Sequence, residues 1–306
     1  MTRSDREVQE AFDELETEMW NEDGADLDLR TTEELVELMN GQDLTVPVAV
    51  AAAAPAIAKA IDAIAERLRG GGRLIYVGAG TSGRLAQLDA AECEVTFAAA
   101  PGQVTALVAG GTVASPLAQE AAEDDAAAGE SELDALGVSE ADAVVATSAS
   151  GRTPYVLGAL AAAREAGALT VCLVSVGGSE LARLAQHEIA IPVGSEILAG
   201  STRLKAGTSQ KLVLNMISTI SMIRLGKTFG NLMVDVHAAN EKLHARVRRI
   251  VLLATGVPLE QVDEALAAAD GDAKVAIVSL LAGTDAEAAR TRLDASGGAI
   301  RRALEQ

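Results

Sequence analysis

The sequence contains few aromatic residues, with three Phe, two Tyr and one Trp, or 2% of its 306 residues. It therefore lacks the aromatic side chains on which many single-strand nucleic-acid binders stack bases. The two cysteines, Cys93 and Cys172, are too few for a disulfide framework and have no metal-ligand spacing. The three histidines have no such spacing either. We therefore expect no metal site. Because aromatic residues are few, we expect a core built mainly from Ala, Val, Leu and Ile.

Positive charge is also scarce, because 25 Lys and Arg stand against 44 Asp and Glu, giving a net charge of −19. Nucleic acids and anionic membranes are bound through basic patches, so this imbalance argues against both as partners. The longest apolar run, 46–58, is too short to span a bilayer and contains Pro47 and Pro55. The charged segment 1–18 does not resemble a signal peptide. We expect a cytoplasmic protein with reduced cysteines.

The middle of the chain alternates short apolar runs with helical segments. This pattern predicts an α/β fold in which a parallel sheet carries helices on both faces. One helix is expected to begin at Ser115–Pro116 and to end at Gly129, and a long apolar helix is expected over 203–225. The predicted strands are 73–77, 104–109, 143–147, 169–174 and 189–193.

Helical segments flank this region on both sides. Upstream, the pattern predicts helices over 5–18, 31–39 and 46–69, and downstream a basic helix over 235–250. Three or four short helices are expected between residues 257 and 304. The sequence thus divides into an N-terminal helical segment (1–59), an α/β domain (60–230) and a small C-terminal helical region (231–306).

Two strand-to-helix turns share one design, in which small residues and hydroxyls meet at a helix start. The first turn supplies Thr81 and Ser82, and the second supplies Ser148, Ser150 and Thr153. Unpaired N–H groups and the positive end of the helix dipole make such a turn an anion site. Two of them at the carboxyl ends of neighbouring strands would flank a ligand crevice. A monophosphate is the anion that we favour, although both turns could also be simple helix caps.

The first turn also matches the dinucleotide pattern G-x-G-x-x-G over Gly78–Gly83. A nucleotide site would need an acidic residue about 20 residues further on to hold the ribose, and 101–104 contains none. No Walker lysine follows Gly78 either. We therefore expect no nucleotide and no other cofactor.

Several longer strings resemble the N-acetylmuramic acid 6-phosphate etherase family, whose members contain a sugar isomerase (SIS) domain. The resemblance covers roughly residues 15–306. It implies a cofactor-free carbon–oxygen lyase that removes the lactyl ether of N-acetylmuramate 6-phosphate, giving N-acetylglucosamine 6-phosphate and D-lactate in cell-wall recycling. The strings are Gly78-Ala-Gly-Thr-Ser-Gly-Arg84, Ser150-Gly-Arg-Thr-Pro-Tyr155, Ser201-Thr-Arg-Leu-Lys-Ala-Gly-Thr208, Asn231-Leu-Met-Val-Asp235 and Asn240-Glu-Lys-Leu243.

The resemblance also implies two catalytic carboxylates. The family's acid/base glutamate lies in a Ser-Glu-Cys string, which here reads Ala91-Glu92-Cys93, so Glu92 takes that role. A second functional glutamate of the family matches Glu123, although Glu120, one helical turn earlier, also remains a candidate. Such groups would remove the C2 proton of the ring-opened sugar and help lactate to leave from C3.

The sequence departs from the family at Ala91, at Glu94–Val95 and at Trp20, which bears on substrate preference. The resemblance also implies that a further helix start, with Ser201, Thr202 and Arg203, closes over the sugar phosphate. Lys205 or Lys211 in this segment could add a cation.

Related SIS domains dimerise, so we expect a homodimer. Because Glu92 lies about ten residues along the helix from Ser82, it would need a chain that folds back after Asp89 or a site on a partner subunit. A non-catalytic phosphosugar-binding regulator and an aldose–ketose isomerase remain alternatives.

Overall fold

The computed structural model describes residues 16–111, 121–235 and 241–305. Within these residues the chain forms two compact units. One comprises the chain up to Ala90 together with Thr105–Ile217, and the other comprises Ala91–Val104 together with the chain from Ser218. The domain limits expected from the sequence, at residues 60 and 231, stay predictions.

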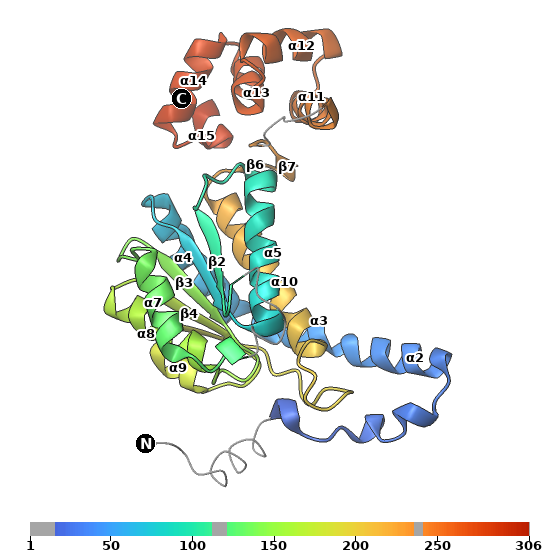
Figure 1. The fold of residues 1–306 in the computed structure, drawn as a ribbon. Coiled ribbons are helices and arrows are strands. Elements are labelled where there is room, and N and C mark those ends of the chain that lie inside the picture. Colours follow the sequence, from blue (N-terminus) through green and yellow to red (C-terminus); the bar gives the residue numbers. More distant parts are fainter. Residues whose placement is uncertain (1–15, 112–120, 236–240, 306) are drawn as a thin grey trace. The chain divides into compact units, whose positions relative to one another are not determined.

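A five-stranded sheet in the order β2-β1-β3-β4-β5 forms the centre of the first unit (Figure 1). β1, β3 and β4 are buried along their whole length, which explains why their sequences are continuous apolar runs. β1 pairs with β3 in parallel, with Gly78 opposite Thr147, so the turns after these strands leave the same edge of the sheet side by side. The strands are β1 (Leu74–Gly78), β2 (Val104–Val108), β3 (Ala143–Thr147), β4 (Leu169–Val174) and β5 (His187–Ala190).

Helices cover both faces of this sheet, as the sequence predicts (Figure 1). On one face, α8 (Pro154–Glu165) contacts β1, β3 and β4 and is flanked by α7 (Ala126–Ala135) and α9 (Glu180–Leu184). On the other face, α4 (Ala54–Arg69) contacts β3, β4 and β5 through its apolar stripe of isoleucines and leucine. The parallel α/β fold is therefore confirmed.

Two helix predictions need correction. The long helix expected over 46–69 is two helices, α3 (Thr45–Ala52) and α4, which meet at Ala53; the helical segments before and after Ala53 are bent by 60°. Pro55 explains the break, because a proline lacks an N–H and clashes with the carbonyl four residues earlier, so it fits only in the first turn of α4.

Gly129 does not end a helix but lies inside α7, where it faces α8. A Cβ at Gly129 would collide with the carbonyl oxygen of Tyr155, and one at Gly158 with that of Ala126. The two glycines therefore allow α7 and α8 to approach closely, and this packing role explains a glycine that the sequence pattern suggested as a stop. The expected start of this helix, Ser115–Pro116, lies outside the described residues.

The remaining elements of the first unit are helical. The helix expected over 31–39 is α2 (Thr32–Asp43), which begins with a capping box formed by Thr31 and Glu34. Of the helix expected over 5–18, the described part, Glu16–Glu18, is a short 3-10 turn. Two helices start in this unit and continue into the second: α5 (Gly80–Phe97) and α10 (Lys205–Arg224).

The second unit is helical. A short antiparallel pair, β6 (Thr228–Phe229) and β7 (Leu232–Met233), precedes α11 (Glu241–Thr255). Asp235, which follows β7, forms ion pairs with Lys274 and Lys227, while burial raises its pKa. Beyond α11, the four helices of the described tail bear out the expected three or four; they are α12 (Leu259–Ala268), α13 (Ala273–Ala282), α14 (Ala286–Ala295) and α15 (Ile300–Leu304).

By length and hydropathy, no single described helix qualifies as a membrane span, although the bent pair Thr32–Ala52 and Ala54–Arg69 meets those two criteria when taken together.

Candidate active site

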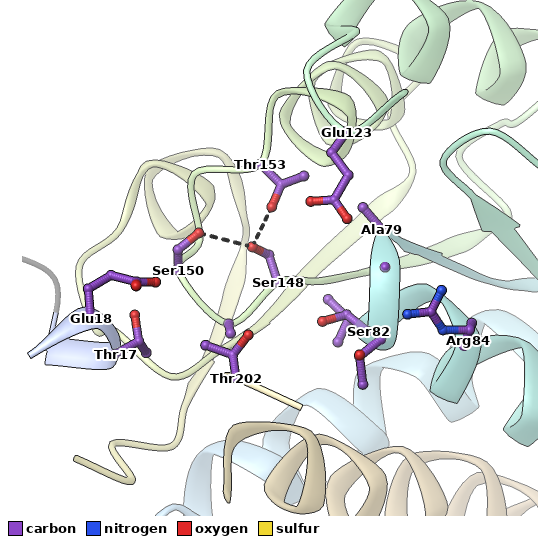
Figure 2. A pocket seen from close by; sticks show the side chains of 14 residues that line it. Thr17, Glu18, Ala79, Ser82, Arg84, Glu123, Ser148, Ser150, Thr153 and Thr202 are labelled. Atoms are coloured by element: carbon purple, nitrogen blue, oxygen red, sulfur yellow. Dashed lines mark hydrogen bonds between the residues drawn. The ribbon is translucent and has the colours of Figure 1, made fainter. Parts of the chain in front are cut away.

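A polar pocket of about 300 Å³ lies in the first unit, where the turns after β1 and β3 meet (Figure 2). Its position at the carboxyl ends of neighbouring parallel strands is where ligands bind in open α/β sheets. Hydroxyl groups dominate its wall, together with two carboxylates and one guanidinium. The lining residues are Thr17, Glu18, Ala79, Gly80, Thr81, Ser82, Arg84, Glu123, Thr147, Ser148, Ala149, Ser150, Thr153 and Thr202.

The first turn presents the start of α5 to this pocket. Gly80, the first residue of the helix, has a φ of 51°, a left-handed conformation that favours glycine. Thr81 and Ser82 follow it and line the pocket. The first N–H groups of a helix have no partner within the helix, and the dipole places positive charge there. The sequence prediction of an anion-binding turn therefore fits this end of the pocket.

The second turn presents three hydroxyl groups to the pocket. Ser148, which is 3% exposed, lies at its centre: its Oγ accepts a hydrogen bond from the Gly151 N–H at 3.1 Å and lies 2.9 Å from Thr153 Oγ1. Ser150 Oγ accepts from the Arg152 N–H at 3.3 Å. Ser148, Ser150 and Thr153 all line the pocket, as the sequence predicts, and together they can donate O–H groups to a bound oxyanion.

The helix that follows this turn is less free to bind an anion than the sequence suggests. Its first residue, Pro154, has no N–H, and the N–H of Tyr155 donates to the carbonyl oxygen of Glu123 at 3.0 Å. Thr153 takes the cap position without a side-chain cap hydrogen bond, because its hydroxyl is paired with Ser148. The two helix starts therefore differ, because α8 lacks the N–H group of Pro154 and has its Tyr155 N–H already paired.

Glu123 lines the pocket beside the start of α5, and Figure 2 shows its carboxylate directed toward Ala79 and Ser148. A Cβ built on Gly80 would lie 2.6 Å from Glu123 Oε1, so the glycine makes room for this carboxylate. The Tyr155 N–H fixes the backbone of Glu123 at the same time. Glu120, the other candidate, lies outside the described residues.

Glu92 is not among the residues that line this pocket. It is an exposed residue of α5, which runs unbroken from Gly80 to Phe97. The chain therefore does not fold back after Asp89, and the first of the two geometries considered for Glu92 is wrong. A rise of 1.5 Å per residue separates Glu92 from Ser82 by about 15 Å along the helix axis.

The segment before α10 contributes one residue to the pocket, Thr202, whereas Ser201 and Arg203 do not line it. Lys205 does not line it either: its Nζ donates to Gln42 Oε1 at 2.9 Å, and its N–H donates to the buried carboxylate of Glu196. Lys211 also lies outside the pocket wall.

Among the pocket residues that sequence reasoning did not assign to a site are Thr17, Glu18 and Arg84. Thr17 and Glu18 precede the α/β region by more than fifty residues of helical sequence and loop, so no local pattern connects them with the turns. Arg84 belongs to the string Gly78–Arg84, but an arginine on a helix is most often a solvated side chain. The Thr17 Oγ1 atom is buried and has no hydrogen-bond partner within the described residues.

Other chemistries are poorly supported by the described residues. Burial, with a smaller effect of Glu188, raises the pKa of Cys172 to about 12, which disfavours a thiolate nucleophile. Burial and the hydrogen bond to Glu132 raise the pKa of Tyr155, so its hydroxyl stays protonated. No group of three or more His, Cys, Asp or Glu side chains in the described residues is placed to hold a metal ion.

This fold and site define a SIS domain, a class of phosphosugar-binding α/β domains. A family model described as "SIS domain" matches residues 126–220, and one described as "Glucokinase regulatory protein N-terminal SIS domain" matches residues 56–164. A solved structure, a phosphoheptose isomerase from Francisella tularensis, has a TM-score of 0.51 at 21% identity, covering 63% of this chain and 100% of that one. This likeness supports the fold alone.

Similarity over nearly the whole chain is much closer to one family. The chain is 58% identical to the N-acetylmuramic acid 6-phosphate etherase of Rubrobacter xylanophilus over 97% of its own length and 98% of that protein. It is 54% identical to the protein of the same name from Streptomyces avermitilis, over 98% and 96% of the two chains. The chain therefore belongs to the N-acetylmuramic acid 6-phosphate etherase family.

Proposed function

We propose that this protein is an N-acetylmuramic acid 6-phosphate etherase, a carbon–oxygen lyase of cytoplasmic amino-sugar recycling. The observation that carries the proposal is the identity of 58% with a protein of that name over 97% of the chain. The pocket supports it independently, because a hydroxyl-rich wall at a helix start suits a phosphate and a carboxylate stands beside it.

The reaction needs proton transfer and no redox step. The hemiacetal of N-acetylmuramate 6-phosphate opens to an aldehyde, which acidifies the C2 proton. A base removes that proton, the C3–O bond breaks with both electrons going to the lactyl oxygen, and an acid protonates the departing lactate. Water then adds across the C2=C3 bond, placing a hydroxyl on C3 and a proton on C2. The net change is one water consumed, with N-acetylglucosamine 6-phosphate and D-lactate formed.

Phosphate binding is assigned to the two turns. The N–H groups at the start of α5 and the hydroxyls of Thr81, Ser82, Ser148, Ser150 and Thr153 are the donors, with Thr202 closing the wall. Ser201 and Arg203, which flank Thr202 in sequence, stay assigned to substrate binding on the resemblance alone.

Glu123 and Glu92 are assigned to proton transfer. Glu123 lies in the pocket wall, whereas Glu92 lies about 15 Å along α5 from Ser82, farther than a hexose phosphate reaches. We infer a homodimer in which Glu92 of one subunit completes the pocket of the other. The exposure of Glu92 on its helix supports this arrangement, because an exposed carboxylate is accessible to a second chain.

The activity is tested by incubating the protein with N-acetylmuramate 6-phosphate and measuring D-lactate with a D-lactate dehydrogenase. Release of D-lactate in equal amount to N-acetylglucosamine 6-phosphate is the expected result. Conversion to a ketose phosphate, or binding without turnover, would contradict the proposal and favour an isomerase or a regulator.

The shared site is tested by mixing two variants, Glu92→Gln and Glu123→Gln. Each alone should lose roughly 10²–10⁴-fold in kcat while still binding phosphosugar. A random mixture of subunits should recover about a quarter of the wild-type activity, because half of the dimers are mixed and one of their two sites has both glutamates. A mixture that stays inactive after subunit exchange would place both groups in one subunit.

A further inference from the structure

Charge is distributed unevenly around the pocket. Its carboxylates belong to Glu18 and Glu123, and Arg84 is the one cation among the described residues that line it. Figure 2 shows Glu18 on the side of the pocket opposite Arg84, with Ser148 between them. Both carboxylates repel an anionic group that enters this pocket, and Arg84, on the side away from Glu18 (Figure 2), is the cation that can attract it.

Some residues of the pocket wall are buried and others are exposed to solvent. Its floor is formed by Thr147 and Ser148, which are 0% and 3% exposed, whereas Arg84 is an exposed residue at the rim. Helical side chains lean toward the N-terminus of their helix, so the Arg84 side chain leans back over the turn that starts at Gly80. Figure 2 shows its guanidinium directed toward the pocket.

The Glu18 side of the pocket lies against a loop that is distant in the sequence. The amide of Asn21 donates to the carbonyl oxygen of Ser195 at 3.1 Å, which ties the N-terminal segment to the loop that leads to Thr202. A Cβ on Gly200 would lie 2.6 Å from Glu18 Oε2, so the carboxylate packs directly on that loop. Glu18 therefore lies in the pocket wall, next to the loop that contains Gly200.

The substrate of the proposed function carries two anions, a phosphate on C6 and a lactyl carboxylate on C3. The hydroxyls and N–H groups of the two turns account for the phosphate without a cation. The carboxylate is the group left without a partner, and guanidinium binds carboxylate through paired, charge-assisted hydrogen bonds.

We propose that Arg84 binds the lactyl carboxylate of the substrate, and that Glu18, on the opposite wall, excludes that carboxylate and accepts hydrogen bonds from uncharged donors of the sugar. This assignment rests on the proposed function. It makes Arg84 the residue that distinguishes the substrate from its product, because N-acetylglucosamine 6-phosphate retains the phosphate and lacks the carboxylate.

The test is a thermodynamic cycle between Arg84 and that carboxylate, measured through kcat/KM for N-acetylmuramate 6-phosphate and for its lactyl methyl ester. The product serves as a competitive inhibitor that reports phosphate binding and correct folding. Arg84→Gln is the test variant, Arg84→Lys keeps the charge without the paired donors, and Arg183→Gln is the matched control. Arg183 is an exposed arginine of α9 that does not line the pocket.

Arg84→Gln should lower kcat/KM for the acid by roughly 10- to 100-fold, the range for hydrogen bonds between charged partners, and leave the product's inhibition constant nearly unchanged. Esterification of the substrate should lower kcat/KM of the wild type to a similar extent and should lower kcat/KM of Arg84→Gln little further. The kcat/KM of Arg84→Lys for the acid should lie between those of the wild type and Arg84→Gln, and that of Arg183→Gln should equal that of the wild type.

Equal weakening of substrate and product in Arg84→Gln would assign Arg84 to the phosphate and overturn the proposal. An unchanged kcat/KM for the acid would overturn it as well. If the wild type releases no D-lactate from N-acetylmuramate 6-phosphate, the proposed function is wrong. This result is distinguishable from failure of the Arg84 assignment, because it is measured on the wild type before any variant is compared.

Discussion

Replacing Gly80 by alanine tests whether the position of the Glu123 carboxylate sets the reaction rate. Two effects of this change can be worked out from the structure. The φ of 51° is left-handed, and this conformation costs a residue with a Cβ about 1–2 kcal/mol. The added Cβ would also lie 2.6 Å from Glu123 Oε1, so the carboxylate must retreat by somewhat less than 1 Å to reach the ordinary contact of 3.4 Å.

The second effect should appear in turnover. A carboxylate at the end of a side chain moves at little cost in stability, but a displacement of about 1 Å in a catalytic group can cost as much as roughly 100-fold in rate. We therefore expect Gly80→Ala to lower the free energy of unfolding by about 1–2 kcal/mol in urea and to lower kcat by roughly 10- to 100-fold.

Gly137→Ala is the matched control. Gly137 has a φ of 58°, and nothing lies within 4 Å of the position that its Cβ would take, so the substitution carries the backbone strain alone. It should lose similar stability and keep normal kcat. The reasoning is refuted if Gly80→Ala turns over like the wild type, or if Gly137→Ala loses activity to the same degree.

Three further predictions concern the turns, an ion pair and metals. Ser82→Ala and Ser148→Ala should each weaken phosphosugar binding by about 1–3 kcal/mol, but only Ser148→Ala should also lose stability, because the Gly151 N–H loses its acceptor; equal stability of the two variants in urea would argue against this. Burial raises the pKa of Asp142, but hydrogen bonds from Arg73 and Ser139 outweigh burial and lower this pKa below its ordinary 3.8. The Asp142 carboxylate therefore stabilises the fold above pH 3.8, and this stabilisation is lost as the pH falls through the lowered pKa. Asp142→Asn should therefore cost about 2–3 kcal/mol at pH 7, and the difference from wild type should shrink below pH 4; a difference independent of pH would contradict the assignment. Because the sequence has no metal-ligand spacing, activity should survive exhaustive EDTA treatment, and activity that zinc or magnesium restores would show this expectation to be wrong.

The sequence predicted the parts of the fold and site that follow from local patterns. β1 and β3 are buried apolar runs that end in small residues and hydroxyls, and parallel strands bring such ends to one edge, so Ser82 and Ser148 were expected in one crevice. The break at Ala53 is also predictable from the sequence, because a proline such as Pro55 fits in the first turn of a helix and not further along it. The many alanines of the segment 46–69 favour a helix throughout, and they conceal this break in the sequence pattern.

The other features depend on contacts between distant residues. Glu18 lines the pocket, and nearby Asn21 donates a hydrogen bond to the carbonyl oxygen of Ser195, 174 residues away. No periodic pattern in the sequence records such a contact. The hydrogen bond from the Tyr155 N–H to Glu123 removes a donor from the second turn and fixes a proposed catalytic residue in the same step. The sequence around Gly129 predicts a helix end there, because the close packing of α8 against this glycine depends on residues outside its own segment.

The measurement that tests the central claim most directly follows isotopes through a single turnover of N-acetylmuramate 6-phosphate in deuterated, ¹⁸O-labelled water. Elimination from C3 followed by addition of water should place deuterium on C2 and ¹⁸O on C3 of N-acetylglucosamine 6-phosphate, and D-lactate should keep its unlabelled ether oxygen. ¹⁸O in that position of the lactate would show that water attacks the lactyl carbon, and the account of this protein as a carbon–oxygen lyase would be wrong.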